Sequence, residues 1–520
     1  LSAYLPGRRW FGAKSRNARR LTIIEAVPFR TRNQPDSAYV LARVEYDQGE
    51  PDSYAILLSA VPADRAAAIE RTVPWALITT IADRGGTVLH LVDGLALPEV
   101  ATAFLDAFRS RATSSSARGT LAFSVEPGFR YRPGPDEPPA AIHRGEQSNT
   151  SVIYPGRFIL KFIRRIEPGI HPQVEMQRFL RGTEFGGSVP HLAGTISYSA
   201  PGQKAAVVGV LEELVTAQYD AWTFAVDELG RMLEEVAAAR IDPPAVPRRA
   251  HPLDAPPTPP AMREAAASWL QFARTLGERT GHLHAALASD REDPAFAPER
   301  YTPFYQRALA QAFRSQARDA FRGLRGKLDA LDEAAREHAE SVLAGESAIL
   351  QRLQAVAGRP LASARIRCHG DLHLGQVLIA GREPIFIDFE GEPVRSLGER
   401  RVKRSPLRDV AGMLRSFHYA SRHALRELVE SQAAGSGTDL ETWARAWNLW
   451  SAAEYLAGYF DVAGSTGLLP SAPEEHRFLL DSFLLDKALY EVRYELDNRP
   501  TWVDIPLQGI IGIMDVAILD

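Results

Sequence analysis

The sequence contains a single cysteine, Cys368, among 520 residues. One thiol cannot form an intramolecular disulfide, and no Cys/His cluster has the spacing of a structural zinc site. Long apolar runs are also missing, since no stretch approaches the roughly 20 residues that span a bilayer. The N-terminus lacks the basic-then-apolar pattern of a signal peptide. These absences predict a cytoplasmic protein that does not bind membranes.

A strong excess of one charge is absent as well. Lys and Arg number 60 against 64 Asp and Glu, which gives a net charge of −4. Nucleic-acid-binding proteins usually carry a basic surplus, so we expect no nucleic-acid partner. The 45% hydrophobic and 24% charged contents are typical of globular proteins. Because domains usually hold roughly 100–200 residues, the length predicts more than one domain.

The first 216 residues have the pattern of a β-rich region. Alternating apolar and polar residues at 21–27, 38–46 and 53–58 predict a small antiparallel sheet. Helical spacing follows at 97–111, and the Ser-rich 113–116 reads as an exposed loop. Further strands are expected at 151–154, 158–163 and 205–211, with a helix over 174–180. The first two of these strands form a hairpin around Pro155-Gly156.

The second half of the chain is mostly helical in pattern. Apolar residues recur at helical spacing over 262–287, 305–353, 444–460 and 477–496. Prolines are dense between 241 and 260, which favours an extended linker or surface excursion over a packed element. We therefore treat 241–261 as a Pro-rich insertion in a helical domain.

The segment 368–390 carries the clearest chemical signal. It reads Cys-His-Gly-Asp-Leu-His-Leu-Gly-Gln over 368–376, and an apolar strand then leads into Asp388-Phe-Glu. Phosphoryl transfer from ATP needs a carboxylate that deprotonates the acceptor hydroxyl and oxygen ligands that hold Mg²⁺. The spacing matches protein kinases, with Asp371 as base and Gln376 and Asp388 as metal ligands. A plain turn and a strand-end cap would explain either fragment alone, but not both at this separation.

Two histidines of this segment are candidates for substrate contacts. His369 is placed to orient the loop by hydrogen bonding, and His373 to line the acceptor pocket. Neither is expected to bind Mg²⁺, which prefers oxygen ligands. For His373 a packed loop histidine is an equally good interpretation.

A nucleotide-binding lobe should precede such a loop and carry a strand lysine that is paired with a helical glutamate. Lys161, in an apolar strand, and Glu175, fourteen residues later, meet that requirement. The preceding turn offers backbone N–H groups and hydroxyls to the ATP phosphates through Gly145, Ser148 and Thr150. An ordinary polar hairpin turn is the alternative.

Four motifs together resemble the bacterial maltokinases. They are Trp-Phe-Gly-Ala-Lys-Ser-Arg at 10–16, His-Gly-Asp-Leu-His-Leu-Gly-Gln at 369–376, Ile-Asp-Phe-Glu-Gly-Glu-Pro at 387–393 and Lys-Ala-Leu-Tyr-Glu-Val-Arg-Tyr-Glu-Leu at 487–496. The resemblance implies transfer of the ATP γ-phosphate to the anomeric hydroxyl of maltose, which gives maltose 1-phosphate for α-glucan and glycogen synthesis. It also implies a possible partnership or fusion with trehalose synthase.

The same resemblance implies an α+β, bilobal protein-kinase-like fold of the aminoglycoside-phosphotransferase type. We expect an N-terminal β-rich cap subdomain over 1–95, a nucleotide-binding N-lobe over 96–216 and an α-helical C-lobe over 217–520. In that family the acceptor sugar contacts a C-lobe helix, and the matching residues are Lys487, Tyr490 and Tyr494. Their spacing places them on one helical face, although tyrosines at this spacing can also pack as core.

The sequence leaves two other functions open. One is a kinase for glucosamine or an aminoglycoside, whose cationic acceptor needs carboxylates. Glu454, Glu491 and Glu495 keep that possibility open. The other is a weakly catalytic partner protein of trehalose synthase.

Overall fold

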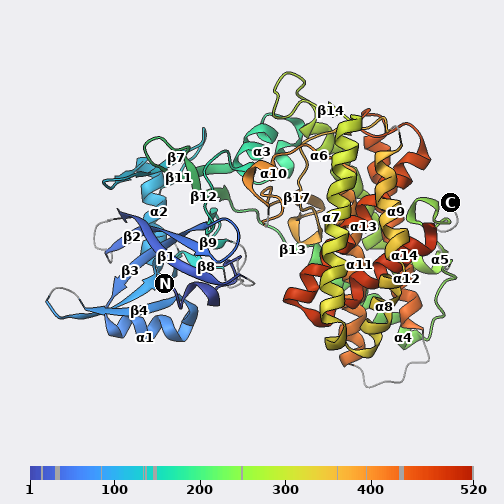
Figure 1. The fold of residues 1–520 in the computed structure, drawn as a ribbon, viewed down its shortest axis with the longest axis horizontal. Coiled ribbons are helices and arrows are strands. Elements are labelled where there is room, and N and C mark those ends of the chain that lie inside the picture. Colours follow the sequence, from blue (N-terminus) through green and yellow to red (C-terminus); the bar gives the residue numbers. More distant parts are fainter. Residues whose placement is uncertain are drawn as a thin grey trace. The chain divides into compact units, whose positions relative to one another are not determined.

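The computed structural model describes residues 1–517 apart from 13–15, 30–35, 83–84, 133, 135–137, 144–148, 248–249, 360, 394 and 432–438. The chain divides into two compact units (Figure 1). Unit 1 contains residues 1–182, 189–216 and 392–400, and unit 2 contains residues 183–188, 217–391 and 401–520. The division separates a β-rich part from a mostly helical part, as the patterns predict.

The first sheet of unit 1 is antiparallel. In the described residues its strand order is β1-β2-β3-β5-β4. The strands are β1 (Ala18–Phe29), β2 (Ser37–Tyr46), β3 (Asp52–Val61), β4 (Leu77–Ala82) and β5 (Val88–Asp93). Two helices accompany it, α1 (Ala63–Thr72) and α2 (Pro98–Ser110). The predicted sheet and the helix over 97–111 are therefore confirmed.

The second sheet of unit 1 runs in the order β6-β7-β11-β12-β10-β9-β8 over the residues that the structure describes. Its strands are β6 (Thr113–Ser115), β7 (Thr120–Val125), β8 (Ala141–Ile142), β9 (Thr150–Tyr154), β10 (Phe158–Phe162), β11 (Leu192–Ser199) and β12 (Ala206–Glu213). The helix α3 (Pro172–Arg181) follows β10, and the short α10 (Leu397–Arg400) also belongs to this unit. The predicted hairpin, helix and strand are all present.

The prediction of a loop over 113–116 was wrong. Thr113, Ser114 and Ser115 form the edge strand β6 and pair with Ala122, Leu121 and Thr120 of β7. The hydroxyls of Ser115 and Thr120 lie 3.0 Å apart across the pair. Strand pairing with a distant partner thus overrides the turn preference of the serines.

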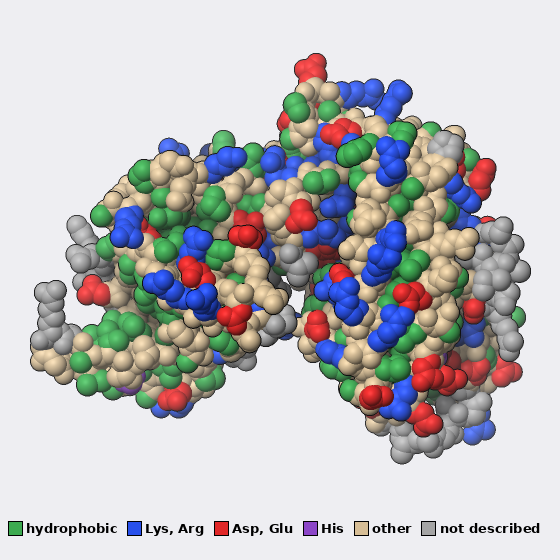
Figure 2. All heavy atoms as spheres, viewed as in Figure 1, with side chains coloured by type: hydrophobic (Ala, Val, Ile, Leu, Met, Phe, Trp, Pro, Cys, Tyr) green, Lys and Arg blue, Asp and Glu red, His purple; other side chains and the backbone are tan. Residues whose placement is uncertain are grey.

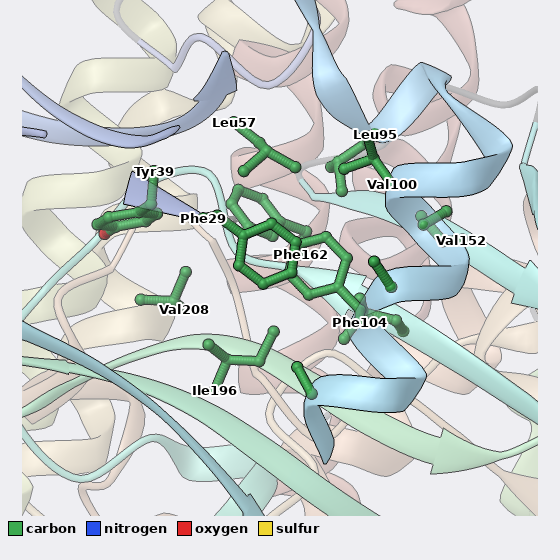
Figure 3. Close-up of a cluster of buried hydrophobic side chains, with 14 of the residues drawn as sticks. Phe29, Tyr39, Leu57, Leu95, Val100, Phe104, Val152, Phe162, Ile196 and Val208 are labelled. Atoms are coloured by element: carbon green, nitrogen blue, oxygen red, sulfur yellow. The ribbon is translucent and has the colours of Figure 1, made fainter. Parts of the chain in front are cut away.

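One hydrophobic core joins both sheets of unit 1. Figure 3 shows Phe29, Tyr39 and Leu57 of the first sheet close to Phe104 of α2 and to Phe162 of the second sheet. The rings of Phe29 and Phe104 stack with centroids 4.8 Å apart. Because α2 packs in the same core as both sheets, the N-terminal sheet and the predicted nucleotide-binding sheet form one body.

A fully buried ion pair reinforces this connection. Arg164 Nη2 lies 2.6 Å from Asp93 Oδ2, and both side chains are 0% exposed. Arg164 Nε also donates to the hydroxyl of Thr150 at 2.8 Å. The guanidinium lies 5.0 Å from the ring of Trp10, which is buried with Phe11 in the N-terminal core. Arg164 therefore binds the N-terminal sheet to the β9–β10 hairpin.

We expect Arg164→Met to destabilise unit 1 by about 3–5 kcal/mol, because it leaves the Asp93 carboxylate buried without its partner. Arg65→Met is the matched control, since Arg65 and Glu99 form an exposed pair worth less than about 1 kcal/mol. Hydrogen–deuterium exchange of β3, β5 and β10 peptides in increasing urea measures the effect. If both variants changed the exchange of these peptides equally, the buried pair of Arg164 and Asp93 would contribute no more to stability than the exposed pair.

Unit 2 is built mainly of helices. They are α4 (Ala221–Ala239), α5 (Pro260–Ala265), α6 (Ala267–Leu287), α7 (Pro303–Lys327), α8 (Glu333–Ala344), α9 (Glu346–Gln354), α11 (Leu407–Ser431), α12 (Leu440–Ala463), α13 (Pro473–Asn498) and α14 (Asp504–Ala517). The short strands of this unit are β13 (Tyr219–Asp220), β14 (Glu299–Arg300), β15 (Ala364–Arg365), β16 (Val377–Ala380) and β17 (Glu383–Phe386). The predicted helical stretches of the second half are confirmed.

Helices α6 and α12 approach each other closely because glycines face the contact. A Cβ on Gly277 would lie 2.0 Å from the carbonyl oxygen of Tyr455, and one on Gly458 would lie 2.2 Å from that of Arg274. Neither position can hold a larger residue without separating the helices. This tight pair also carries His284, which contacts Asp409 of α11.

The Pro-rich segment is irregular and most of its described residues are at least partly exposed, as expected for a surface segment, but it also makes specific contacts with the helices of unit 2. Its His251 is 5% exposed and lies 3.0 Å from the Asp481 carboxylate of α13. The carbonyls of Ile241 and Pro256 accept hydrogen bonds from the indoles of Trp443 and Trp450 on α12. Proline removes backbone donors but leaves the carbonyls free, so an extended segment can still dock on two helices.

The surface carries both charge signs. On the face seen in Figure 2, Lys and Arg side chains are interspersed with Asp and Glu, in keeping with the small net charge of −4. None of the helices in the described parts of the chain is long and apolar enough to cross a membrane.

Candidate active site

The loop that carries Asp371 is held in place by Asp409, at the start of α11. Asp409 is 2% exposed, and its carboxylate accepts hydrogen bonds from the backbone N–H of His369 at 2.7 Å and of Gly370 at 2.9 Å. Gly370 has a φ of +89°, which favours glycine at the turn. Asp409 thus braces the loop that carries Asp371.

Asp409 is itself supported by a buried histidine. His284 of α6 places Nε2 3.3 Å from the carboxylate, and its Nδ1 lies 3.0 Å from the hydroxyl of Tyr459. Burial alone would raise the pKa of Asp409, but the hydrogen bond and charge of His284, with help from His369 and Gly370, lower it. The carboxylate therefore remains an acceptor for the loop backbone at neutral pH.

His369 links the loop that carries Asp371 to the segment that precedes Asp388. Its Nε2 lies 2.8 Å from the carbonyl oxygen of Ile387, and its ring lies 4.8 Å from the ring of Phe389. The residue is 1% exposed. This geometry agrees with the predicted loop-orienting role. The adjacent Cys368 is also buried, and burial raises the pKa of its thiol, which makes the sulfur a poor nucleophile.

The two predicted metal ligands are adjacent. Gln376 ends the 3₁₀ turn Leu374–Gln376, and its Nε2 lies 3.2 Å from Asp388 Oδ2. The hairpin of β16 and β17 around Gly381 brings them together, as the sequence predicts. Asp388 has a φ of +66°, a strained conformation for a residue with a side chain. Such strain is found mostly at functional sites, where the surrounding structure maintains it.

Asp371 has a cationic neighbour that comes from α13. Lys487 Nζ lies 3.1 Å from Asp371 Oδ1, and the two side chains are 22% and 25% exposed. The same ammonium lies 5.0 Å from the ring centroid of Tyr490. The rings of Tyr490 and Tyr494 stack at 6.5 Å, and Tyr494 is 40% exposed. The structure thus brings the three predicted acceptor residues together on one helical face beside Asp371.

His373 lies in the same loop but is held as a neutral side chain. Its Nδ1 accepts a hydrogen bond from the N–H of Gly375 at 3.1 Å. Burial lowers the pKa of His373, so the ring is uncharged at neutral pH. Of the two interpretations offered by the sequence, these contacts favour a packed loop histidine.

The predicted nucleotide residues lie in unit 1. Lys161 Nζ is 3.3 Å from Glu212 Oε2 of β12. Glu212 is 2% exposed and also accepts a hydrogen bond from Gln173 of α3, the helix that carries Glu175. The sequence missed Glu212 as a partner. Lys161 faces Val210 across the β10–β12 pair, so Glu212 is a diagonal neighbour on the same face, which only the strand register reveals.

The turn before β9 is only partly described. Gly145 and Ser148 lie outside the described residues. Thr150 is 7% exposed, and its hydroxyl accepts the hydrogen bond from Arg164. In this arrangement the Thr150 side chain supports the hairpin, a role that the sequence pattern did not indicate.

Three carboxylates kept a kinase for a cationic acceptor possible in the sequence, those of Glu454, Glu491 and Glu495. In the structure each of them forms an ion pair with an arginine. Arg415 binds Glu491 with Nε–Oε2 and Nη2–Oε2 distances of 2.8 Å. Arg499 binds Glu495 at 2.7 Å, and Arg274 lies 3.4 Å from Glu454. Each of these three carboxylates therefore has an arginine partner within unit 2.

A family model described as the maltokinase N-terminal cap domain matches residues 4–96. The resemblance to the maltokinase family is thereby confirmed. Within the maltokinase-like chain, the cap model ends just before α2 and takes in the whole first sheet of unit 1.

Curated relatives extend the likeness beyond the cap. The chain is 26% identical to a glucosamine kinase of Mycolicibacterium smegmatis over 374 residues, which is 71% of this chain and 78% of the relative. It is 25% identical to a glucosamine kinase of Streptacidiphilus jiangxiensis over 450 residues, or 84% of this chain and 82% of the relative. These matches support a sugar kinase.

Solved structures agree on the fold. A glucosamine kinase in complex with glucosamine, ADP and inorganic phosphate matches with a TM-score of 0.59 at 17% identity and covers 99% of both chains. A glucosamine kinase in crystal form A matches with a TM-score of 0.57 at 18% identity, over 95% of this chain and 92% of that chain. At this identity the likeness establishes the fold alone, and the predicted kinase-like α+β fold class is confirmed.

The maltokinase-like chain should lose stability in mild acid through His418 of α11. Burial, with the charges of Arg415 and Arg422, holds the pKa of His418 well below its usual value, and Nδ1 accepts from Arg415 at 3.0 Å. The unfolded imidazole binds a proton below about pH 6.5, whereas the folded one does not. The free energy of unfolding therefore falls as pH drops from about 7, by up to about 1.4 kcal/mol per unit for this one group.

His418→Gln removes that contribution and keeps an acceptor for Arg415. We expect a smaller loss of unfolding free energy between pH 7.5 and 5.5 in this variant than in the parent, as measured by urea unfolding at both pH values. A variant that loses as much stability as the parent would show that His418 is protonated in the folded state.

Proposed function

We propose that the chain is an ATP-dependent sugar kinase that phosphorylates maltose at its anomeric hydroxyl and supplies maltose 1-phosphate for α-glucan synthesis. The observation that carries the proposal is the group formed by Asp371, Lys487, Tyr490 and Tyr494. It places a carboxylate at the end of an aromatic face that suits a pyranose ring.

Asp371 acts as the base in this proposal. The anomeric oxygen attacks the γ-phosphorus, the bond between that phosphorus and the β,γ-bridging oxygen breaks, and ADP leaves. The proton of the attacking hydroxyl passes to the Asp371 carboxylate. His369, Gly370 and Asp409 keep the carboxylate in place while the proton moves.

Gln376 and Asp388 fit magnesium by their chemistry, since they bring an amide oxygen and a carboxylate to neighbouring positions. When bound, the metal would neutralise charge on the ATP phosphates. In unit 1, Lys161 would contact the phosphates, supported by Glu212 and Glu175. Gly145 and Ser148 remain candidates for contacts to the ATP phosphates, through backbone N–H groups and a hydroxyl.

We prefer a neutral acceptor sugar to a cationic one because of the charges in unit 2. A cationic acceptor needs free carboxylates, and Glu454, Glu491 and Glu495 are each paired with an arginine. The Tyr490–Tyr494 face offers ring stacking and phenol hydroxyls, which suit a neutral sugar. These contacts support maltose over an amino sugar or an aminoglycoside.

Glucosamine is the second candidate, because the curated relatives at 25–26% identity are glucosamine kinases. ADP release with Mg-ATP and a panel of maltose, glucose, glucosamine, trehalose and kanamycin separates the candidates. We expect maltose to give the highest kcat/KM. A kcat/KM for glucosamine far above that for maltose would make the second candidate correct.

A further inference from the structure

The catalytic loop of this chain contains no lysine or arginine. Between residues 368 and 376 the basic side chains are His369 and His373. In phosphoryl transfer the negative charge is spread over the equatorial oxygens of the moving group, and enzymes place cations beside it. Apart from the proposed metal, these two histidines are the groups of the loop itself that could carry a positive charge.

Neither histidine meets this need. The pKa of His373 is lowered by burial, and its Nδ1 already accepts from the loop backbone. His369 is 1% exposed, and its Nε2 is engaged with the carbonyl of Ile387. Both rings have structural contacts within the loop and the neighbouring strand, so a further protein cation beside Asp371 would come from another element.

Lys487 is the cation that the fold brings to this position. It comes from α13, 116 residues after Asp371 in sequence, and its ammonium lies 3.1 Å from Asp371 Oδ1. We propose that Lys487 contacts the transferring phosphoryl group and stabilises its developing negative charge, in addition to any contact with the acceptor sugar. This inference rests on the proposed kinase function and adds a catalytic role on phosphorus to a residue expected only at the sugar.

The geometry supports this role because of where the base must lie. A base that takes the acceptor proton lies within hydrogen-bond reach of the attacking oxygen, about 2.6–3.2 Å away. That oxygen attacks the phosphorus, so an ammonium 3.1 Å from the base is close to the reacting atoms. An ammonium has three donors, so one can remain on Asp371 while another reaches a phosphoryl oxygen.

The packing around Lys487 suits an ammonium group that is held in a fixed position. Its ammonium lies 5.0 Å from the ring of Tyr490, one helical turn away, where the electron-rich ring face attracts a cation. The side chain is 22% exposed, so solvent screens it less than a surface lysine. Tyr490 and Asp371 together hold the ammonium at the end of the aromatic face, next to the base.

The test compares Lys487→Met and Lys487→Arg with the matched control Lys327→Met. Lys327 pairs with Asp497 at 2.9 Å on an exposed part of α7, so its removal repeats the chemical change away from the loop. We expect Lys487→Met to lower kcat at saturating sugar by about 10²–10³-fold, as for the loss of one transition-state donor. Lys487→Arg should recover part of the lost kcat, and the kcat of Lys327→Met should equal that of the parent. An increase in sugar KM with parent-like kcat would overturn the proposal.

A second readout does not depend on turnover. Calorimetry of ADP with magnesium and fluoroaluminate, which mimics the transferring phosphoryl group, should give tighter binding than ADP with magnesium alone. We expect fluoroaluminate to tighten ADP binding in the parent and in Lys327→Met, but not in Lys487→Met. A full gain in Lys487→Met would overturn the role on phosphorus. If the parent phosphorylated none of the panel sugars, the proposed acceptor would fail, while the calorimetry would still decide the role of Lys487.

Discussion

Asp371→Asn should lower kcat by about 10²–10⁴-fold, the usual contribution of a positioned general base. The amide is almost the same size as the carboxylate but cannot take the proton of the acceptor hydroxyl. It also replaces the anion beside Lys487 by a neutral group, so a small change in the position of that ammonium is expected. Steady-state kinetics with Mg-ATP and maltose measure the effect, with far-UV circular dichroism to establish that the variant is folded.

Asp319→Asn is the control for this change. Asp319 forms an exposed pair with Arg322 and lies on α7, so its neutralisation should leave kcat at the parent value. An Asp371→Asn protein that phosphorylated its sugar as fast as the parent would remove Asp371 from the mechanism, whatever acceptor the enzyme prefers.

Asp409→Ala should reduce both stability and catalysis. It leaves the backbone N–H groups of His369 and Gly370 without their acceptor, at about 1–3 kcal/mol for each unsatisfied group. The Nε2 atom of His284 loses its partner as well. We expect the free energy of unfolding of unit 2 to fall by about 3–5 kcal/mol. The loop that carries Asp371 loses its support, so kcat should fall by about 10²-fold, as for a small misplacement of a catalytic group.

Asp409→Asn separates the two effects, because its amide oxygen can still accept one loop N–H. It should lie between the parent and Asp409→Ala in both urea midpoint and kcat. If Asp409→Ala were destabilised but kept the parent kcat per folded molecule, Asp409 would support the fold without positioning the catalytic loop.

Much of the catalytic segment could be predicted because its contacts are local. Gln376 and Asp388 are separated by one hairpin, whose Gly381 turn is visible in the sequence. Lys487, Tyr490 and Tyr494 share a face because helical spacing requires it. Where a single element determines the neighbours, periodicity and turn residues are enough.

The contacts that the sequence did not reveal join distant elements. Lys161 pairs with Glu212 because of the register between β10 and β12, which no local pattern encodes. The contact of Lys487 with Asp371 depends on how α13 packs beside the loop. Tertiary packing determines such pairs, and side-chain chemistry alone cannot choose among the many candidates.

The Pro-rich segment illustrates the same limit. Its composition correctly predicts an irregular backbone, but not that the carbonyls of Ile241 and Pro256 bind two indoles of α12. Likewise, Glu491 and Glu495 look available in the sequence, and only the fold shows that Arg415 and Arg499 pair with them.

The central claim is that this chain transfers the γ-phosphate of ATP to a sugar through Asp371. Phosphorus NMR of the protein with Mg-ATP and maltose tests it most directly, since both product and nucleotide are observed. We predict that the γ-phosphate signal of ATP gives way to that of a glycosyl phosphate in the parent, but not in Asp371→Asn. ATP that stays intact with every sugar of the panel, or equal product from the Asp371→Asn protein, would contradict the account.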